Sequence, residues 1–317
     1  MKKILCVLMS CLLFVMAGCS GHSKNLKFGA ADIGGVYYSF ASTFTQLADK
    51  EIDGYTFETK TTAGSVANLR LISDGYIDLA IVQADLLSDA YNATGTFADK
   101  KYQKGYKAVT SLYTECCQIV VRKDSGITGD LINKTVSVGA SESGSEKNAE
   151  QILKMSGITD ELINKVNMDY TEAAEKLKAG EIDAFFCTAG TRTEVIGQLS
   201  KECDICLISL DDKCIDKMLS AYSLCEKYTI PAGTYNGQDS DVTTIGVKAV
   251  LIAKQSLSDD VIKNVTKTIY EHADDFKYAT SLDISFDINT AADGVDIPFH
   301  SGAAAYYTER GINVLTE

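Results

Sequence analysis

Residues 71–82, LISDGYIDLAIV, and residues 177–186, LKAGEIDAFF, share one pattern. Each stretch reads as the end of a helix, a glycine that stops it, and an Ile-Asp pair that opens an apolar strand. The two copies begin 106 residues apart, which is too long for a solenoid repeat and suits two similar lobes. We therefore predict one lobe from residues 26–114 and 226–317 and a second from residues 115–225, with the Ile-Asp strands in separate sheets.

Apolar strands and amphipathic helices alternate along the chain. Residues 27–48, for example, read as a short strand, a glycine-rich turn and a helix with apolar residues at helical spacing. This alternation predicts an α/β fold with parallel sheets, whose ligands bind beyond the carboxyl ends of the strands. Small polar turns fall at such ends in residues 29–35, 62–65, 140–145 and 188–192. Facing turns on two lobes predict a ligand cleft, although a glycine turn before a helix is also common in structures without a ligand.

The first 18 residues read as a targeting segment. Two lysines precede an apolar run, and Met16-Ala17-Gly18 places small residues directly before Cys19. This is the pattern of a lipoprotein signal peptide, with Cys19 lipidated and residues 19–25 a linker. The apolar run is too short for a comfortable membrane anchor. We expect an exported protein that is tethered by lipid to the outer face of the cytoplasmic membrane or lies in the periplasm.

The chain is acidic. Its formal charge is −13, and loss of the lysines in residues 1–18 makes it more negative by two units. An acidic exported protein is a poor candidate for binding nucleic acid. Because its overall field repels anions, an acidic ligand has to be captured by local groups.

Seven cysteines remain beyond Cys19, an odd number in a large chain, so the sequence does not indicate a disulfide scaffold. Cys203 and Cys206 have the spacing of a metal or redox pair, but no histidine lies near them and Cys206 is predicted in a buried strand. We expect no metal and no cofactor.

The sequence contains no recognisable catalytic group. The histidines are His22 in the linker, His272 on a helix and His300 before the last helix, and none has a local signature of a nucleophile–base pair. The serines in residues 143–145 lack the nucleophile-elbow pattern, and residues 29–35 lack the dinucleotide fingerprint. This favours binding over catalysis, so we expect that the protein is not an enzyme.

Several motifs, taken in order, carry a resemblance to a known family. They are GGVYYSFA at 34–41, TAGSVANLRLI at 62–72, DLAIVQAD at 78–85, GASESGSEKNAEQIL at 139–153, TAG at 188–190, IPAGTYNGQDSDVTTIGVKAVLI at 230–252 and IPFHSGAAAYYTERG at 297–311. The chain resembles the solute-binding proteins of TAXI-type TRAP transporters through nearly its whole mature length.

That resemblance implies a bilobal type II periplasmic-binding-protein fold, with two α/β lobes joined by a hinge around a cleft. It implies a small carboxylate-bearing ligand, such as glutamate, glutamine or a related dicarboxylate, and TRAP membrane permease subunits as partners. A ligand sensor or adhesin of the same fold without a permease is the alternative, and neighbouring permease genes would favour transport. An extracellular hydrolase is the third possibility, but the sequence shows no acid–base pair for it.

The resemblance also implies the ligand-binding residues. In the first lobe they are Gly35, Tyr37, Tyr38, Thr62, Gly64, Ser65, Asn68 and Gln83, and in the second Ser143, Gly144, Ser145, Asn148, Thr188, Ala189 and Gly190. We expect residues 143–148 to bind the carboxylate through backbone N–H groups and hydroxyls at a helix start, although a serine or asparagine there is equally a simple cap. Arg192 stands where the family often has proline, and we predict that it reaches into the cleft or, alternatively, points to solvent.

Overall fold

The computed structural model describes residues 23–99, 104–281 and 286–317. The predicted signal peptide, the lipidation site Cys19 and most of the predicted linker lie outside the described residues. Among the described residues, no helix is long and apolar enough to cross a membrane.

In the part of the chain that the structure describes, ten strands form one hydrogen-bonded sheet in the order β2-β1-β3-β10-β4-β7-β5-β6, with β8 paired to β4 and β9 to β10. The strands are β1 (Lys24–Gly29), β2 (Tyr55–Lys60), β3 (Leu79–Gln83), β4 (Tyr106–Arg122), β5 (Thr135–Ser137), β6 (Asn164–Val166), β7 (Ala184–Ala189), β8 (Ile205–Leu207), β9 (Cys225–Ile230) and β10 (Val242–Lys254). β1 lies parallel to β2 and β3, and β5 lies parallel to β6 and β7, so the two ends of the sheet have the same strand order. We call the part built on β1–β3 the first half and the part built on β5–β7 the second half.

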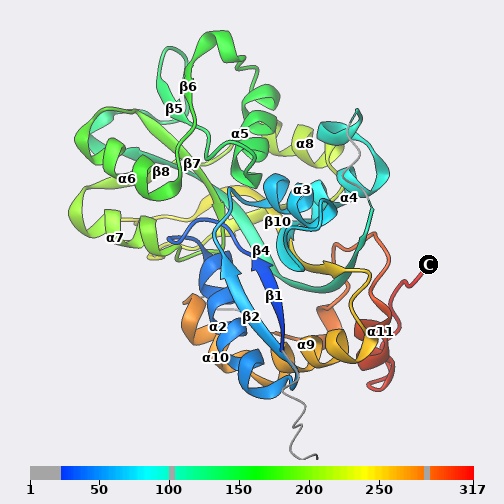
Figure 1. Ribbon diagram of the computed structural model, residues 1–317. Coiled ribbons are helices and arrows are strands. Elements are labelled where there is room, and N and C mark those ends of the chain that lie inside the picture. The colour runs from blue at the N-terminus through cyan, green and yellow to red at the C-terminus, as the bar shows by residue number, and fades with distance from the viewer. Residues whose placement is uncertain (1–22, 100–103, 282–285) are drawn as a thin grey trace, which may run out of the picture.

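The helices surround this sheet. They are α2 (Val36–Glu51), α3 (Ser65–Ser73), α4 (Ala84–Asn92), α5 (Gly144–Met155), α6 (Tyr170–Ala179), α7 (Glu194–Glu202), α8 (Asp212–Ala221), α9 (Asp259–Glu271), α10 (Ala273–Thr280) and α11 (Ser301–Thr308), with short 3₁₀ turns η1 (Gly95–Phe97), η2 (Lys123–Ser125), η3 (Asp160–Leu162) and η4 (Ile288–Thr290). Figure 1 shows α5, α6 and α7 gathered around the second half at the top, and α2, α9, α10 and α11 below.

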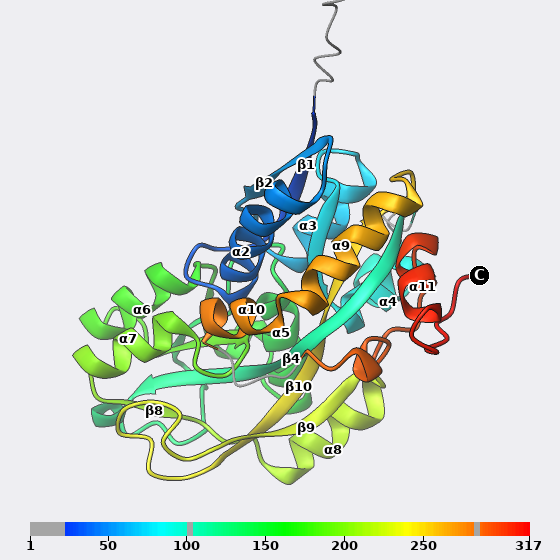
Figure 2. The ribbon, with the colours of Figure 1, turned by 90° about the horizontal axis from the view of Figure 1, so that it is seen from below.

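The long antiparallel strands β4 and β10 run between the halves (Figure 2). β3 pairs with the last third of β10, whereas β7 pairs with the end of β4, so the two halves occupy opposite ends of this central pair. The expectation that the two Ile-Asp strands lie in separate sheets is therefore wrong, because β4 and β10 hydrogen-bond both halves into one sheet. The predicted boundary after Thr114 falls inside β4, and the exact division into lobes stays a prediction.

The repeated Gly-x-Ile-Asp motif has the same structural role in both halves. Asp78 accepts a hydrogen bond from the Lys27 N–H at 2.9 Å, and its own N–H donates to the Lys27 carbonyl at 2.8 Å. Asp183 makes the same two bonds with Thr135, both at 2.8 Å. In each half the aspartate thus fixes the register of the third strand against the first.

The C-terminal segments return to the first half. Phe276 of α10 stacks on Phe40 of α2 with ring centroids 4.4 Å apart, and the Tyr307 hydroxyl donates to the Val109 carbonyl of β4 at 2.8 Å. The larger apolar core fills the first half and continues along one face of the sheet into the second half. A smaller apolar core lies on the opposite face of the sheet in the second half. These contacts show that the chain after residue 225 packs against the first half, as predicted.

Local sequence patterns misplace some strand boundaries. The apolar run at 118–122 suggests a short strand, but it is only the end of β4, whose earlier residues include polar ones that hide the apolar pattern. Residues 228–230, which adjoin a loop-like stretch, belong to β9. Cys206 lies in a strand as expected, but its side chain is exposed because β8 is a short edge strand.

Candidate functional site

A cavity of about 280 Å³ lies between the two halves, at the small end of the range for small-molecule sites. Helices α2, α3, α5 and α6 all begin at its wall, since their first residues are among those that line it. The first N–H groups of a helix have no partner inside the helix, and the helix dipole favours an anion at that end. The cavity therefore presents several favourable positions for a small anionic group.

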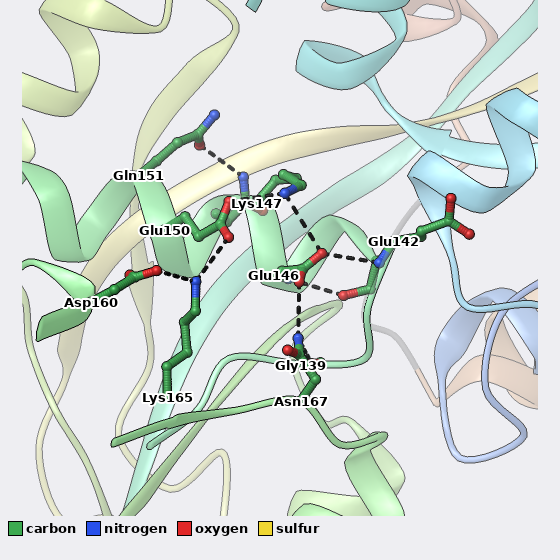
Figure 3. A network of polar contacts seen from close by, with 11 residues as sticks. Gly139, Glu142, Glu146, Lys147, Glu150, Gln151, Asp160, Lys165 and Asn167 are labelled. Carbon is green, nitrogen blue, oxygen red and sulfur yellow. Dashed lines mark hydrogen bonds and ion pairs between the residues drawn. The ribbon is translucent and has the colours of Figure 1, made fainter. Parts of the chain in front are cut away.

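The turn before α5 is held by a polar network (Figure 3). The Ser143 hydroxyl accepts from the Glu146 N–H at 3.0 Å, which confirms the predicted helix cap. The Glu146 carboxylate accepts from the Glu142 N–H at 3.0 Å and from the Asn167 amide at 2.9 Å, and Asn167 also donates to the Gly139 carbonyl. These contacts fix the backbone that leads into the cavity wall.

The two halves meet across the cavity at the starts of α3 and α5. The Ala67 N–H donates to the Glu142 carbonyl at 3.1 Å, and the Arg70 guanidinium makes two bonds to the Glu142 carboxylate. Gly64, with φ of 118°, lies so close to Ser143 that a Cβ there would meet its Cα at 3.4 Å. The two halves are thus in direct contact beside the cavity.

Ser145 and Tyr170 join three elements of the second half at the cavity wall. The Ser145 hydroxyl accepts from the Thr188 N–H at 2.9 Å and lies 2.5 Å from the Tyr170 hydroxyl, which donates to the Thr188 carbonyl at 2.9 Å. The Ser143 and Ser145 hydroxyls are thus engaged within the protein. The Glu146 N–H is also taken, by the Ser143 hydroxyl, so the N–H groups of Gly144 and Ser145 are the first-turn donors of α5 that a ligand can use.

Glu115 of β4 lines the cavity and is 2 % exposed. Its Oε2 accepts from the Tyr37 hydroxyl at 3.0 Å and from the Gln83 amide at 3.2 Å. Burial raises the pKa of the Glu115 carboxyl to about 8, and the charge of Asp85 adds to the effect of burial. Burial therefore favours the neutral form of the Glu115 carboxyl group.

Two more carboxyl groups face the cavity from opposite halves. Asp32 lies in the turn before α2, and Asp169 caps α6 by accepting from the Glu172 N–H at 2.8 Å. Burial, followed by the charge of Asp169, raises the pKa of Asp32. No lysine, arginine or histidine is among the described residues that line this cavity.

Most of the predicted ligand-binding residues line the cavity. These are Gly35, Tyr37, Thr62, Gly64, Ser65, Gln83, Ser143, Gly144, Ser145, Thr188 and Ala189. Tyr38, Asn68, Asn148, Gly190 and Arg192 do not line it.

The residues outside the lining have other contacts. The Asn68 amide donates to the Ala30 and Ile81 carbonyls at 2.6 and 2.9 Å, so it ties β1 to β3. The Asn148 amide lies 3.4 Å from the Asp85 carboxylate of α4, and Tyr38 packs against the main core. The Gly190 carbonyl accepts from the Thr193 hydroxyl at 2.6 Å.

Arg192 is exposed and lies on a separate surface depression beside Glu194 and Lys201. Its backbone has φ of 65°, and it directly precedes Thr193, the cap residue of α7. Proline, whose ring holds φ near −65°, cannot adopt this conformation. The proline that the family often has at this position therefore does not fit the backbone of this chain.

Sequence reasoning missed nine lining residues. They are Ala31, Asp32, Val36, Thr61, Ala63, Glu115, Ala140, Asp169 and Tyr170. Glu115 is the only carboxylate within the β4 sequence, but the polar residues before it obscure the strand pattern, so the sequence did not single it out. Among the described residues, no group of three or more histidine, cysteine, aspartate or glutamate side chains could hold a metal ion.

Solved structures share this fold at low sequence identity. PhnD1 from Prochlorococcus marinus, solved with methylphosphonate, has a TM-score of 0.57 and 13% identity, covering 84% of this chain and 94% of its own. A protein from Bordetella bronchiseptica has a TM-score of 0.53 and 17% identity, covering 81% and 76%. A periplasmic transporter has a TM-score of 0.51 and 14% identity, covering 81% and 86%. The α/β fold is thus that of the bilobal periplasmic binding proteins.

The chain belongs to the NMT1-like family, whose model matches residues 28–311. This match spans both halves and every element that lines the cavity. It does not by itself distinguish the TAXI type.

Proposed function

We propose that the protein is an extracytoplasmic solute receptor of the TAXI type, which captures a small carboxylate-bearing ligand and delivers it to a TRAP permease. The observation that carries this proposal is the cavity between two halves at which four helices begin. Helix starts bind a carboxylate through N–H groups and the dipole, without needing a cation. The methylphosphonate complex of PhnD1 supports a small anionic ligand by analogy of fold.

The cavity favours reversible binding over chemistry. The carboxyl groups that line it are accompanied by no histidine or cysteine among the lining residues. Closure of two halves on a ligand is the expected motion for a receptor that presents its cargo to a membrane partner. A sensor or adhesin with the same fold remains the alternative function.

An ABC permease is the alternative membrane partner, since a candidate L-cystine ABC transporter from Listeria monocytogenes shares this fold. Neighbouring genes for TRAP or ABC permease subunits distinguish these partners. The absence of both would favour a sensor.

Binding is tested by calorimetry on protein that has been unfolded, dialysed and refolded to remove retained ligand. Glutamate, glutamine and a series of dicarboxylates are the first compounds to titrate. Micromolar binding of one of them supports the proposal, and no binding at millimolar concentration of any small carboxylate contradicts it.

The proposed lipid anchor is tested by labelling. We expect labelled fatty acid to be incorporated into the wild-type chain and not into Cys19→Ala.

A further inference from the structure

The cavity lining combines three carboxyl groups with no cationic side chain. Asp32, Glu115 and Asp169 line it, and the remaining described lining residues are uncharged. A ligand that carried only carboxylates would bring further negative charge to these groups. The helix starts favour anionic groups through their N–H donors, but no cationic side chain among the described lining residues offsets the charge of the three carboxyl groups.

Glu115 has room to accept a further hydrogen bond. Both of its bonds, from Tyr37 and Gln83, end on Oε2, and among the described residues none donates to Oε1. Both donors are neutral, so they leave the charge of an ionised Glu115 uncompensated. A cationic donor in the cavity would supply that compensation.

A second acceptor beside Glu115 is unsatisfied. The side-chain carbonyl of Gln83 is buried in the cavity wall and has no hydrogen-bond partner among the described residues. Asp32 Oδ2 is likewise buried without a partner. Buried acceptors without a donor are uncommon and costly, so each indicates that a bound molecule brings the donor.

We propose that Glu115 selects ligands that carry a protonated amine, which it binds together with the Gln83 carbonyl while the ligand carboxylate lies at the helix starts. This inference rests on the proposed receptor function and narrows its ligand to zwitterions of the amino-acid kind. Amine-free dicarboxylates are poor ligands in this account, because two anionic groups would meet a cavity that already holds three acids.

The surroundings of Glu115 agree with this role. The titratable groups that interact with it are all acids, namely Tyr37, Tyr113, Tyr170, Cys116, Cys187 and Asp85. Burial raises the pKa of Glu115 to about 8, and the charge of Asp85 acts in the same direction. Binding an ammonium group lowers that pKa, so the neutral acid releases its proton to solvent as the ion pair forms.

Matched pairs of compounds test the proposal. Each pair consists of an amine-bearing compound and its amine-free counterpart: glutamate and glutarate, aspartate and succinate, and leucine and 4-methylpentanoate. Refolded, ligand-free protein is incubated with an equimolar mixture of all six compounds. Native mass spectrometry then identifies the compound that the protein retains. Calorimetry then gives the dissociation constants of each retained compound and its counterpart. We expect an amine-bearing compound to be retained and to bind at least tenfold more tightly than its amine-free counterpart.

The same titrations are repeated on two matched variants. Glu115→Gln keeps an acceptor for Tyr37 and is expected to lose at least tenfold in affinity for the amine-bearing compound. Glu226→Gln, an identical change at an exposed residue of β9 that bonds Thr114, is expected to stay within twofold of wild type. Circular dichroism shows whether both variants are folded.

Each other outcome contradicts the proposal. If an amine-free compound binds within twofold of its counterpart, or Glu115→Gln binds the amine as well as wild type, the selection by Glu115 is wrong while the receptor function stands. If no compound of the mixture binds at millimolar concentration, both the receptor function and this inference are contradicted.

Discussion

Arg70 of the first half and Glu142 of the second are joined by two hydrogen bonds, from Nε to Oε1 at 3.1 Å and from Nη2 to Oε2 at 2.6 Å. This bidentate ion pair joins α3 to the turn before α5, next to the residues that line the cavity. It links the two halves beside the cavity.

We predict that Arg70→Gln favours the open arrangement and weakens ligand binding by about twofold to fivefold. A partly exposed ion pair contributes up to about 1 kcal/mol, which corresponds to that range. Small-angle scattering with and without ligand measures the opening, and calorimetry measures the affinity. Lys178→Gln, which removes an ion pair between α6 and α7 within the second half, serves as the control. Equal behaviour of the two variants would show that the Arg70–Glu142 pair does not hold the halves together.

Gly144 allows Gln83 to lie against the start of α5. A Cβ at this position would come within 2.3 Å of Gln83 Oε1 and 2.7 Å of Nε2. Gly144→Ala therefore pushes the Gln83 amide into the cavity, and we expect at least a tenfold loss of affinity, about 1.4 kcal/mol.

Gly197→Ala is the control for that change. Gly197 lies in α7, and a Cβ there would meet no atom within 4 Å. Alanine is favoured over glycine in a helix, so this variant should be at least as stable as wild type and bind ligand normally. Normal ligand affinity in Gly144→Ala would show that Gln83 does not contribute to the site.

The stability of the ligand-free protein should depend on Glu115. Its pKa is raised from an ordinary 4.5 to about 8, so the folded state holds a proton that the unfolded state has lost between these values. The contribution of Glu115 to stability is complete below pH 4.5 and is lost as the pH rises through 8. Glu115→Gln removes this loss.

We therefore expect the melting temperature of wild type to fall more steeply than that of Glu115→Gln between pH 5 and pH 8. Asp85, whose pKa burial raises to about 6, produces a smaller decline in both proteins. Scanning calorimetry without ligand at several pH values measures the difference. Parallel curves for the two proteins would mean that Glu115 does not titrate in this window.

We predict that the Asp183 carboxylate contributes to the stability of the folded protein and not to ligand binding. Asp183→Ala leaves the Thr135 N–H without its acceptor at the edge of β5, which costs about 1–2 kcal/mol. Asp183→Asn retains an oxygen acceptor and should be close to wild type. Urea unfolding measures stability and calorimetry measures binding. A large loss of affinity in a folded Asp183→Asn protein would contradict this purely structural role.

The sequence predicted features that depend on local signals. The Gly-x-Ile-Asp motif repeats because Asp78 and Asp183 each fix one strand to its parallel neighbour, and this requirement is local. The helix start at Ser143 was predicted for the same reason, since its cap lies three residues away.

Features set by distant contacts were missed. The length of β4 depends on its pairing with β10. Thr114 and Glu115 are polar and interrupt the apolar pattern, so the sequence alone does not indicate that the strand continues through them. Glu115 meets Tyr37 and Gln83 only through the folded sheet. The positive φ of Arg192 depends on the turn that follows β7, which residue types alone did not reveal.

A crystal structure of the protein with its retained ligand tests the central claim most directly. The account predicts a small zwitterion in the cavity, with its carboxylate within hydrogen-bond distance of the first N–H groups of α5 and its amine within about 3.2 Å of Glu115. A ligand bound elsewhere, or one in this cavity that places no amine against Glu115, would contradict it.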